Sequence, residues 1–525
     1  MAAPADRAAT TIMVTAAERV VVAAATVALA GLLAMWAVVA PTYRASDEPM
    51  HVSTTMRLAE SGRYPAPGRA LMDPSVLASF RWVDYFGATG RAPKPVQALR
   101  LAHPPTMVAL EAPDAPRPRT DVDQMTQHPP AYYLVLAAAV RVLRLDALGP
   151  TDLVLALRLL TALMLLPVPW LCQRVARRLG LPARVAGAAA FVPAAWMQLL
   201  HSSSTVNNGA LLALATGVAT AAVVPAALGD VRLRRAVCVG LAVSVALLTK
   251  GFALALLPVV VITYLVAIRR AGLWHSVRAL VVALLATLPG LWWWVLNVVR
   301  YGTVQPQGGS ATPPVADLPP LSQWAHDFTL TWMRTLWIAL GWAENRPPAR
   351  LTIGLTVGAV VLLLAGTWAL RRRLGAALVM HLTWLGPLAI VVLGSYQEFE
   401  SSGTTRAAQG RYVQTGVVAL VVLATAALAR LSRLVPALPL LVVGLAGGGL
   451  VFGLDHFWAP VAGHDPLWGR VLAAGSWLPG GATWLIAAAA VTVAATVVGT
   501  AALRAVAVST PTTSPEARPE PVPVG

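Results

Sequence analysis

Charged side chains are scarce in this sequence. Asp, Glu, Lys and Arg make up 12% of the 525 residues, whereas soluble globular domains contain about 25%. Hydrophobic residues make up 57%, and the mean hydropathy is +0.66. This composition excludes an ordinary soluble domain. Because apolar runs of about 18 or more residues recur along the chain, and each is a candidate transmembrane helix, we predict an all-α polytopic membrane protein.

Cysteine and several catalytic signatures are also nearly or wholly missing. Only two cysteines occur, Cys172 and Cys238, and both lie near arginine-rich segments. We predict free thiols, so a disulfide framework is excluded. The sequence has no Walker A loop, no G-x-S-x-G elbow and no H-E-x-x-H motif. These absences argue against ATP hydrolysis and zinc proteolysis.

Acidic residues are few and are distributed differently from arginine. The net charge is +17. The sequence has no basic patch interleaved with aromatic residues, which is the pattern that would indicate nucleic-acid binding. Arginine clusters fall between apolar runs, as in 172–184, 230–235 and 371–373, which is the positive-inside pattern of cytoplasmic loops. Nine of the 23 acids lie instead in 41–128. We therefore predict a multi-pass protein of the cytoplasmic (inner) membrane with both termini in the cytoplasm.

The apolar runs predict about 12–13 transmembrane helices. They lie near residues 18–40, 130–146, 151–171, 183–200, 208–228, 233–249, 251–268, 277–297, 352–370, 376–394, 412–430, 434–453 and 482–504. Thirteen full crossings would place the arginine-rich segment 172–184 outside, against the charge pattern. We therefore expect residues 129–171 to cross only once, with 128–145 as a tilted, interfacial or partial helix.

The same pattern divides the chain into domains. We expect a cytoplasmic segment at 1–17, a transmembrane domain at 18–505 and a disordered, proline-rich cytoplasmic tail at 506–525. Four longer polar segments are expected on the outer face: 41–128, 300–350, 395–411 and 454–481. The first is a long external loop carrying interfacial helices, and the second is another large external loop. Within the second, Trp332, Trp337 and Trp342 predict an interfacial helix, which could also cover a lipid tail.

Acids and histidines stand at both ends of the first external loop. The loop begins with "SDEPMH", which contains Asp47, Glu48 and His51, and it ends with "DQMTQHPPAYY", which contains His128. Both ends adjoin a helix and must lie at the membrane surface, so these side chains can line one cavity. Carboxylates and imidazoles act as general bases or bind divalent cations. A solvated loop that carries no site is the alternative interpretation.

Basic side chains also reach the outer ends of spans. We expect Lys250, Arg300, Arg406 and Arg411, the last beside Tyr412, to bind a lipid-linked phosphate, because cations pair with phosphate oxygens and arginine does so bidentately. The alternative interpretation is that these basic side chains only anchor the helix ends, with their charged groups extended to the membrane surface. Asn207 and Asn208 begin another span at this face. They are candidate substrate contacts, although a helix N-cap would also explain an asparagine there.

Taken in order, these motifs resemble a known superfamily. An N-terminal span followed by "DEPMH" and, after a long loop, by "HPPAYY" is similar to the GT-C integral-membrane glycosyltransferases, including the protein O-mannosyltransferases. The stretches "VNNGAL", "LTK", "LGW" and "QGRY" resemble one bacterial branch, the DUF2142-like membrane proteins. Gly209 stands where an Asp is common in that branch. The resemblance covers roughly residues 15 to 505.

The resemblance implies a membrane glycosyltransferase. It would move a sugar from a polyprenyl-phosphate donor to an envelope glycan, lipid or protein on the extracytoplasmic face, with inversion. Asp47 would be the catalytic base, and Glu48 would support it. In the related aminoarabinose transferases an acid shortly before the Pro-Pro pair belongs to the site, whereas Gln127 and His128 stand there in this chain. A divalent cation, Mg or Mn, is a further expectation.

Elementary chemistry is compatible with this assignment. A departing phosphate needs nearby cations, which Lys250 and Arg411 could supply. An inverting displacement needs one base, not the carboxylate pair of glycoside hydrolases. Two alternatives stay open. A transporter or flippase of lipid-linked sugar predicts ionisable residues lining a path through the spans, which contain few. A non-catalytic scaffold does not require Asp47 and His128 to converge.

Overall fold

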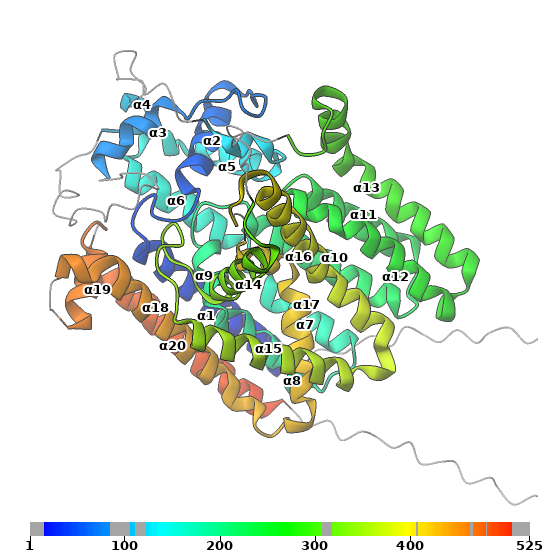
Figure 1. The fold of residues 1–525 in the computed structure, drawn as a ribbon. Coiled ribbons are helices and arrows are strands. Elements are labelled where there is room, and N and C mark those ends of the chain that lie inside the picture. The colour runs from blue at the N-terminus through cyan, green and yellow to red at the C-terminus, as the bar shows by residue number, and fades with distance from the viewer. Residues whose placement is uncertain are drawn as a thin grey trace, which may run out of the picture.

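The computed structural model describes residues 15–83, 105–110, 122–306, 318–405, 408–462, 466–478 and 480–506. Within these ranges the chain is helical and forms no strand, apart from two isolated bridges, Leu71↔Val122 and Leu340↔Asn345. Long helices lie side by side, and short helices gather beyond one end of them (Figure 1). This arrangement confirms the predicted all-α polytopic fold.

Ten helical stretches of the described chain are long and apolar enough to cross a membrane. Five are single helices: α1 (Ala16–Val39), α10 (Gly209–Ala227), α13 (Leu273–Tyr301), α15 (Ala349–Ala369) and α20 (Thr483–Ala505). The other five join shorter pieces: α6 (Pro150–Leu163) with α7 (Val168–Arg178), η6 (Gly251–Ala255) with α12 (Leu256–Ala271), η7 (Arg371–Arg373) with α16 (Leu374–Ser402), η8 (Gly410–Gly416) with α17 (Val417–Ala426) and η9 (Ala427–Leu431), and η10 (Val435–Ala437) with α18 (Leu438–Ala462).

The remaining predicted spans are shorter than a crossing helix. Helix α5 (Ala131–Leu143) has 13 residues and is about 20 Å long, less than the ~30 Å of hydrocarbon. Helix α11 (Leu233–Leu247) has 15 residues. The predicted span 183–200 is divided into α8 (Ala183–Ala189), η5 (Val192–Ala195) and α9 (Met197–Ser203). Pro193 lies at the break. Proline has no backbone N–H to donate to the helical hydrogen-bond pattern, which favours an interruption there.

The arginine-rich segments share one end of the bundle. The Arg373 guanidinium donates to the Arg178 carbonyl at 3.1 Å. The Arg184 side chain donates to the Arg504 carbonyl at 2.7 Å. Segment 172–184 therefore lies at the same end as 371–373, as a single crossing of residues 129–171 requires. The compartment that this end faces stays a prediction.

The opposite end carries the short helices. Residues 41–128 contribute α2 (Glu48–Ser61), α3 (Pro74–Ser79), η1 (Phe80–Trp82), α4 (Met107–Leu110) and η3 (Gln124–Gln127). Helices α14 (Leu321–Trp337) and α19 (Leu467–Gly475) come from later polar segments. Helix α14 agrees with the helix predicted around Trp332 and Trp337, but it ends at Trp337, and Trp342 lies in a turn beyond it.

Helix α16 is longer than its predicted apolar span, which ended at residue 394. It continues through "SYQEFESS" to Ser402, where Gly403 takes the left-handed conformation (φ 65°) and ends it. No proline or glycine interrupts this polar stretch. At 1.5 Å per residue, its 29 residues span about 44 Å, more than a bilayer core. The polar end of α16 therefore projects among the short helices.

Candidate active site

A cavity of about 670 Å³ opens among the short helices. Six of the predicted site residues line it: Asp47, His51, His128, Lys250, Arg411 and Tyr412. They come from the start of α2, the approach to α5, the turn between α11 and η6, and the start of η8. The fold therefore brings together motifs that lie up to 364 residues apart in the sequence.

Asp47 occupies an unusual backbone position at the cavity. Its φ of 65° and ψ of 0° place it in the left-handed region, directly before α2. A non-glycine residue held in this conformation costs free energy, and such residues cluster at functional sites. Its Oδ2 accepts a hydrogen bond from Arg411 Nη2 at 2.8 Å. The Asp47 side chain is 24% exposed, so a ligand in the cavity can reach it.

Glu48 turns away from the cavity into a buried ion pair. Its two carboxylate oxygens accept from Arg158 at 2.6 and 2.7 Å, and Oε1 also accepts from the Val206 amide at 3.0 Å. Arg158 further donates to the carbonyls of Ala37, in the last turn of α1, and of Pro41, just beyond it. The pair joins the end of α1, the start of α2 and α6, and so positions Asp47. Sequence analysis missed Arg158, although an arginine inside an apolar span signals a special role.

A tyrosine hydroxyl contacts each of the two histidine residues, the side chain of His51 and the backbone of His128. His51 Nδ1 lies 2.9 Å from the Tyr133 hydroxyl, and the two rings are stacked. The Tyr64 hydroxyl donates to the His128 carbonyl at 2.8 Å. Burial, reinforced by nearby Lys250, lowers the pKa of both imidazoles well below 6.5. Both rings are therefore neutral at physiological pH.

A buried aspartate fixes the elements that carry these histidines. Asp123 accepts from Ser53 Oγ at 2.8 Å and from Thr54 Oγ1 at 2.9 Å, so it joins α2 to η3. Its Oδ1 also accepts from the Met125 amide at 3.0 Å. Burial raises the pKa of the Asp123 carboxyl to about 6. The Asp123 carboxylate thus holds the two ends of segment 41–128 against each other.

Lys250 is a partly buried cation with few protein partners. Its Nζ donates to Asn208 Oδ1 at 3.0 Å and lies over the ring of Tyr412, 5.4 Å from the centroid. Burial and the Arg411 charge lower the pKa of Lys250 to about 7, although Asp47 acts in the opposite sense. An anion bound beside Lys250 would stabilise its charged form.

Several buried nitrogen atoms around these cations lack hydrogen-bond partners. Among the described residues they include His128 Nδ1, Asn208 Nδ2, Arg411 Nε and Gln414 Nε2. Buried polar groups in folded proteins are nearly always paired, so a cluster of unpaired ones calls for an explanation. A bound phosphate would supply acceptor oxygens to the donors of this set.

A close approach between two helices places Arg411. The Gly410 amide donates to Thr335 Oγ1 at 2.7 Å. A Cβ on Gly410 would lie 2.4 Å from the Leu336 nitrogen and 2.5 Å from the Trp332 carbonyl oxygen. Only glycine fits this contact between η8 and α14, which explains the glycine of the "QGRY" stretch.

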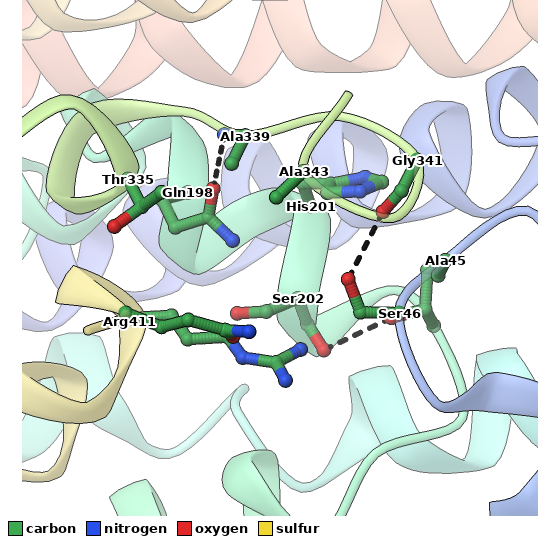
Figure 2. Close-up of a pocket in the computed structure, with 12 residues that line it drawn as sticks. Ala45, Ser46, Gln198, His201, Ser202, Thr335, Ala339, Gly341, Ala343 and Arg411 are labelled. Atoms are coloured by element: carbon green, nitrogen blue, oxygen red, sulfur yellow. Dashed lines mark hydrogen bonds between the residues drawn. The ribbon is translucent and has the colours of Figure 1, made fainter. Parts of the chain in front are cut away.

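Arg411 also reaches two smaller hollows beside the main cavity. One is shown in Figure 2, where Gln198 and Ser46 hold the segment after α14. Gln198 Oε1 accepts from the Ala339 amide at 2.6 Å, and Ser46 Oγ donates to the Gly341 carbonyl at 3.1 Å. The other hollow is lined by Asn207 and Lys250. Arg411 thus lies where the three spaces meet.

An apolar cavity of about 290 Å³ lies beside the same element. Its lining includes four tryptophans, Trp196, Trp332, Trp337 and Trp384. Val413, in the same short helix η8 as Arg411, also lines it. An apolar space therefore begins close to the cationic end of the polar cavity.

The remaining predicted residues are placed differently. Arg300 is exposed at the end of α13 and is not part of the described cavity lining. Arg406 lies outside the described residues. In the described part of the chain, no group of three His, Cys, Asp or Glu side chains could hold a metal ion. The expected Mg or Mn ion stays a prediction.

Comparisons with known proteins match one family, and the solved structures similar to this chain include those of two proteins. ArnT from Cupriavidus metallidurans is similar at 18% identity both with undecaprenyl phosphate (TM-score 0.45, 92% of this chain and 76% of that one) and in the apo state (0.44, 89% and 74%). The Archaeoglobus fulgidus oligosaccharyltransferase tethered with an acceptor peptide is similar at 13% identity (TM-score 0.33, 72% and 47%). No curated protein matches the chain. The family described as "Predicted membrane protein (DUF2142)" matches residues 30–421, so the chain belongs to the DUF2142 family.

Proposed function

We propose that this protein is an inverting membrane glycosyltransferase that uses a polyprenyl-phosphate-linked sugar. The observation that carries the proposal is the Asp47–Arg411 contact of 2.8 Å beside the partly buried Lys250, at one cavity. The arrangement provides a partly exposed carboxylate and two cations within one site. A sugar transfer from a phosphate donor needs both kinds of group.

Lys250 and Arg411 would bind the donor phosphate. Arginine offers a planar fork of donors to phosphate oxygens, and the lysine adds a second positive charge. As the bond between the anomeric carbon and the phosphate oxygen breaks, negative charge develops on that oxygen. Cations already in place stabilise this charge without further reorganisation.

Asp47 would act as the general base. The acceptor hydroxyl attacks the anomeric carbon, its proton passes to the Asp47 carboxylate, and polyprenyl phosphate departs with the bonding electron pair. In the structure, Arg411 donates a hydrogen bond to Asp47. A bound phosphate would draw Arg411 toward itself and leave the carboxylate free to accept the proton.

The apolar cavity suits the start of the lipid chain. Its lining is almost wholly hydrophobic and includes Trp332 and Val413, so isoprenoid groups would be removed from polar surroundings there. Because Val413 follows Arg411 within η8, a chain in this cavity could end at a phosphate held by Arg411. This placement supports a lipid-linked donor over a soluble sugar phosphate.

The proposal is tested in a strain that lacks the protein. We expect mass spectrometry to show a missing sugar on an envelope component and accumulation of a polyprenyl-phosphate sugar. Asp47→Asn should reproduce both changes, whereas Asp152→Asn, at an exposed acid outside the described cavity lining, should restore the wild-type pattern. Full restoration by Asp47→Asn would contradict the base assignment and favour a transporter or a scaffold.

A further inference from the structure

The main cavity is rich in glutamine. The protein has eleven glutamines in 525 residues, and five of them line this one cavity: Gln124, Gln127, Gln305, Gln397 and Gln409. They come from η3, the turn after α13, the projecting end of α16 and the segment before η8. We call these five residues the glutamine collar. Side chains from four separate segments thus present the same functional group to one space.

The collar adjoins the groups assigned to the phosphate. Gln409 lies two residues before Arg411, and Gln127 directly precedes His128. Gln305 reaches the Lys250 turn, since a Cβ on Gly251 would lie 2.5 Å from Gln305 Oε1. A sugar attached to a phosphate between Lys250 and Arg411 would therefore lie within reach of these carboxamides.

Carboxamides suit one class of sugar. Each has two N–H donors and an acceptor oxygen and carries no charge. A sugar hydroxyl also both donates and accepts, so the two groups are complementary without an ionic partner. A uronic acid would instead favour added arginine or lysine, and an amino sugar would favour carboxylates. Glu398 also lines the cavity, but it already has a partner within the protein.

We propose that the glutamine collar selects a donor whose sugar is a neutral, polyhydroxylated hexose or pentose. This inference rests on the proposed function, because the collar is placed relative to the donor phosphate. It adds the chemical class of the transferred group. The cations hold the phosphate, which every such donor shares, and the carboxamides distinguish the sugars.

Binding to the purified full-length protein in lipid nanodiscs tests the inference. The probes are undecaprenyl phosphate alone and undecaprenyl phosphate carrying glucose, glucuronic acid or 4-amino-4-deoxyarabinose, with affinity read from tryptophan fluorescence. We expect the glucosyl lipid to bind about tenfold more tightly than the bare lipid phosphate, as one or two net hydrogen bonds would give. The acidic and amino sugars should gain no more than about twofold.

Single substitutions locate the effect. Gln305→Ala and Gln397→Ala should each reduce the affinity for the glucosyl lipid about three- to tenfold and leave the affinity for bare undecaprenyl phosphate unchanged. Gln323→Ala, at an exposed glutamine of α14 outside the described cavity lining, is the control and should change neither. Gln397→Glu should shift the preference toward the amino sugar.

The outcomes separate the two proposals. If bare undecaprenyl phosphate binds in a Lys250-dependent manner but all four lipids bind equally, the collar inference is wrong and the proposed function stands. Tightest binding of the acidic or amino sugar would also overturn the inference. If none of the four lipids binds, or if Lys250→Ala changes no affinity, the proposed function is wrong, and the collar inference, which rests on it, is wrong as well.

Discussion

Lys250 links the chemistry of the site to pH. Its amine lies over the rings of Phe252 and Tyr412 and has Asn208 as its hydrogen-bond acceptor. With a pKa of about 7, it is charged below neutrality and loses its charge as the pH rises above 7. A phosphate ligand gains from the charged form only. Donor affinity should therefore depend on pH in the range where an exposed lysine does not titrate.

We predict that affinity for undecaprenyl phosphate falls about five- to tenfold between pH 6 and pH 9, a range set by the lowered pKa of Lys250. Lys250→Arg should keep the charge throughout and flatten this profile, because arginine stays protonated. Titration of nanodisc-bound protein by tryptophan fluorescence gives the profile. An equally steep fall in the arginine variant would assign the titration to another group.

The sequence predicted these residues but not their contacts. Asp47 and Arg411 are 364 residues apart, and nothing in the spacing of either motif says that they meet. Their chemistry could be predicted because acids and cations at helix ends on the arginine-poor face stand out from the apolar runs. Glu48 shows the limit of this reasoning. Its neighbour in sequence lines the cavity, while Glu48 itself is fully buried against Arg158.

At the scale of elements, the contact between η8 and α14 decides where Arg411 lies. We predict that Gly410→Ala destabilises the fold by about 1–3 kcal/mol, as overpacking of a filled site does. It should also weaken lipid-phosphate binding at least about tenfold, because Arg411 moves with its backbone. Thermal unfolding and donor binding measure the two effects.

A matched glycine provides the control for Gly410. Gly354 lies on α15, where an added Cβ meets nothing within 4 Å. Gly354→Ala should leave binding unchanged and keep or slightly raise stability, since alanine favours helix over glycine. Normal donor binding by Gly410→Ala would show that the tight contact does not position Arg411.

The buried Glu48–Arg158 pair joins α2 to α6. We predict that Arg158→Met lowers the free energy of unfolding by about 3–5 kcal/mol, because it leaves a buried carboxylate without a partner. Arg232→Ala is the control, since its pair with Asp230 is 45% exposed on the arginine side and should contribute at most about 1 kcal/mol. Equal effects in thermal unfolding would show that burial of the pair does not matter.

Hydropathy predicted the boundaries of the long apolar helices, but it missed boundaries that depend on the local backbone. Long apolar helices such as α1 and α20 lie within a few residues of the predicted runs. The break at Pro193 within 183–200 and the polar extension of α16 were missed. Both depend on local backbone rules. Pro193 interrupts the apolar run 183–200, although Pro289 and Pro387 lie within the continuous helices α13 and α16. The polar end of α16 contains no helix breaker, so the helix continues through it.

At the scale of the whole molecule, charge and site lie at opposite ends. The arginine-rich segments are joined by contacts such as Arg373 to Arg178, while the cavity lies among the short helices. The sequence predicted this polarity from the positive-inside pattern. It could not give the paths of the elements between the two ends, because apolar runs record membrane depth and not which helices are neighbours.

We predict the orientation from this polarity and expect labelling to report it. In a Cys238→Ser background, Arg178→Cys should react with an impermeant maleimide only after the cells are opened. Ser61→Cys, at an exposed position at the end of α2, should react in intact cells. Cys172 is buried and should stay unlabelled. The reverse pattern would invert the proposed topology.

The buried Glu48–Arg158 pair also has a consequence for biogenesis. Glu48 is synthesised 110 residues before Arg158. When α6 inserts into the bilayer with the Arg158 charge, its partner Glu48 has therefore already been made. An unpaired arginine at the centre of a helix costs about 2.5–3.5 kcal/mol to insert. Docking of α6 against α1 and α2 relieves this cost. We therefore expect an order of assembly in which the first loop folds before the second long span is stably retained in the membrane.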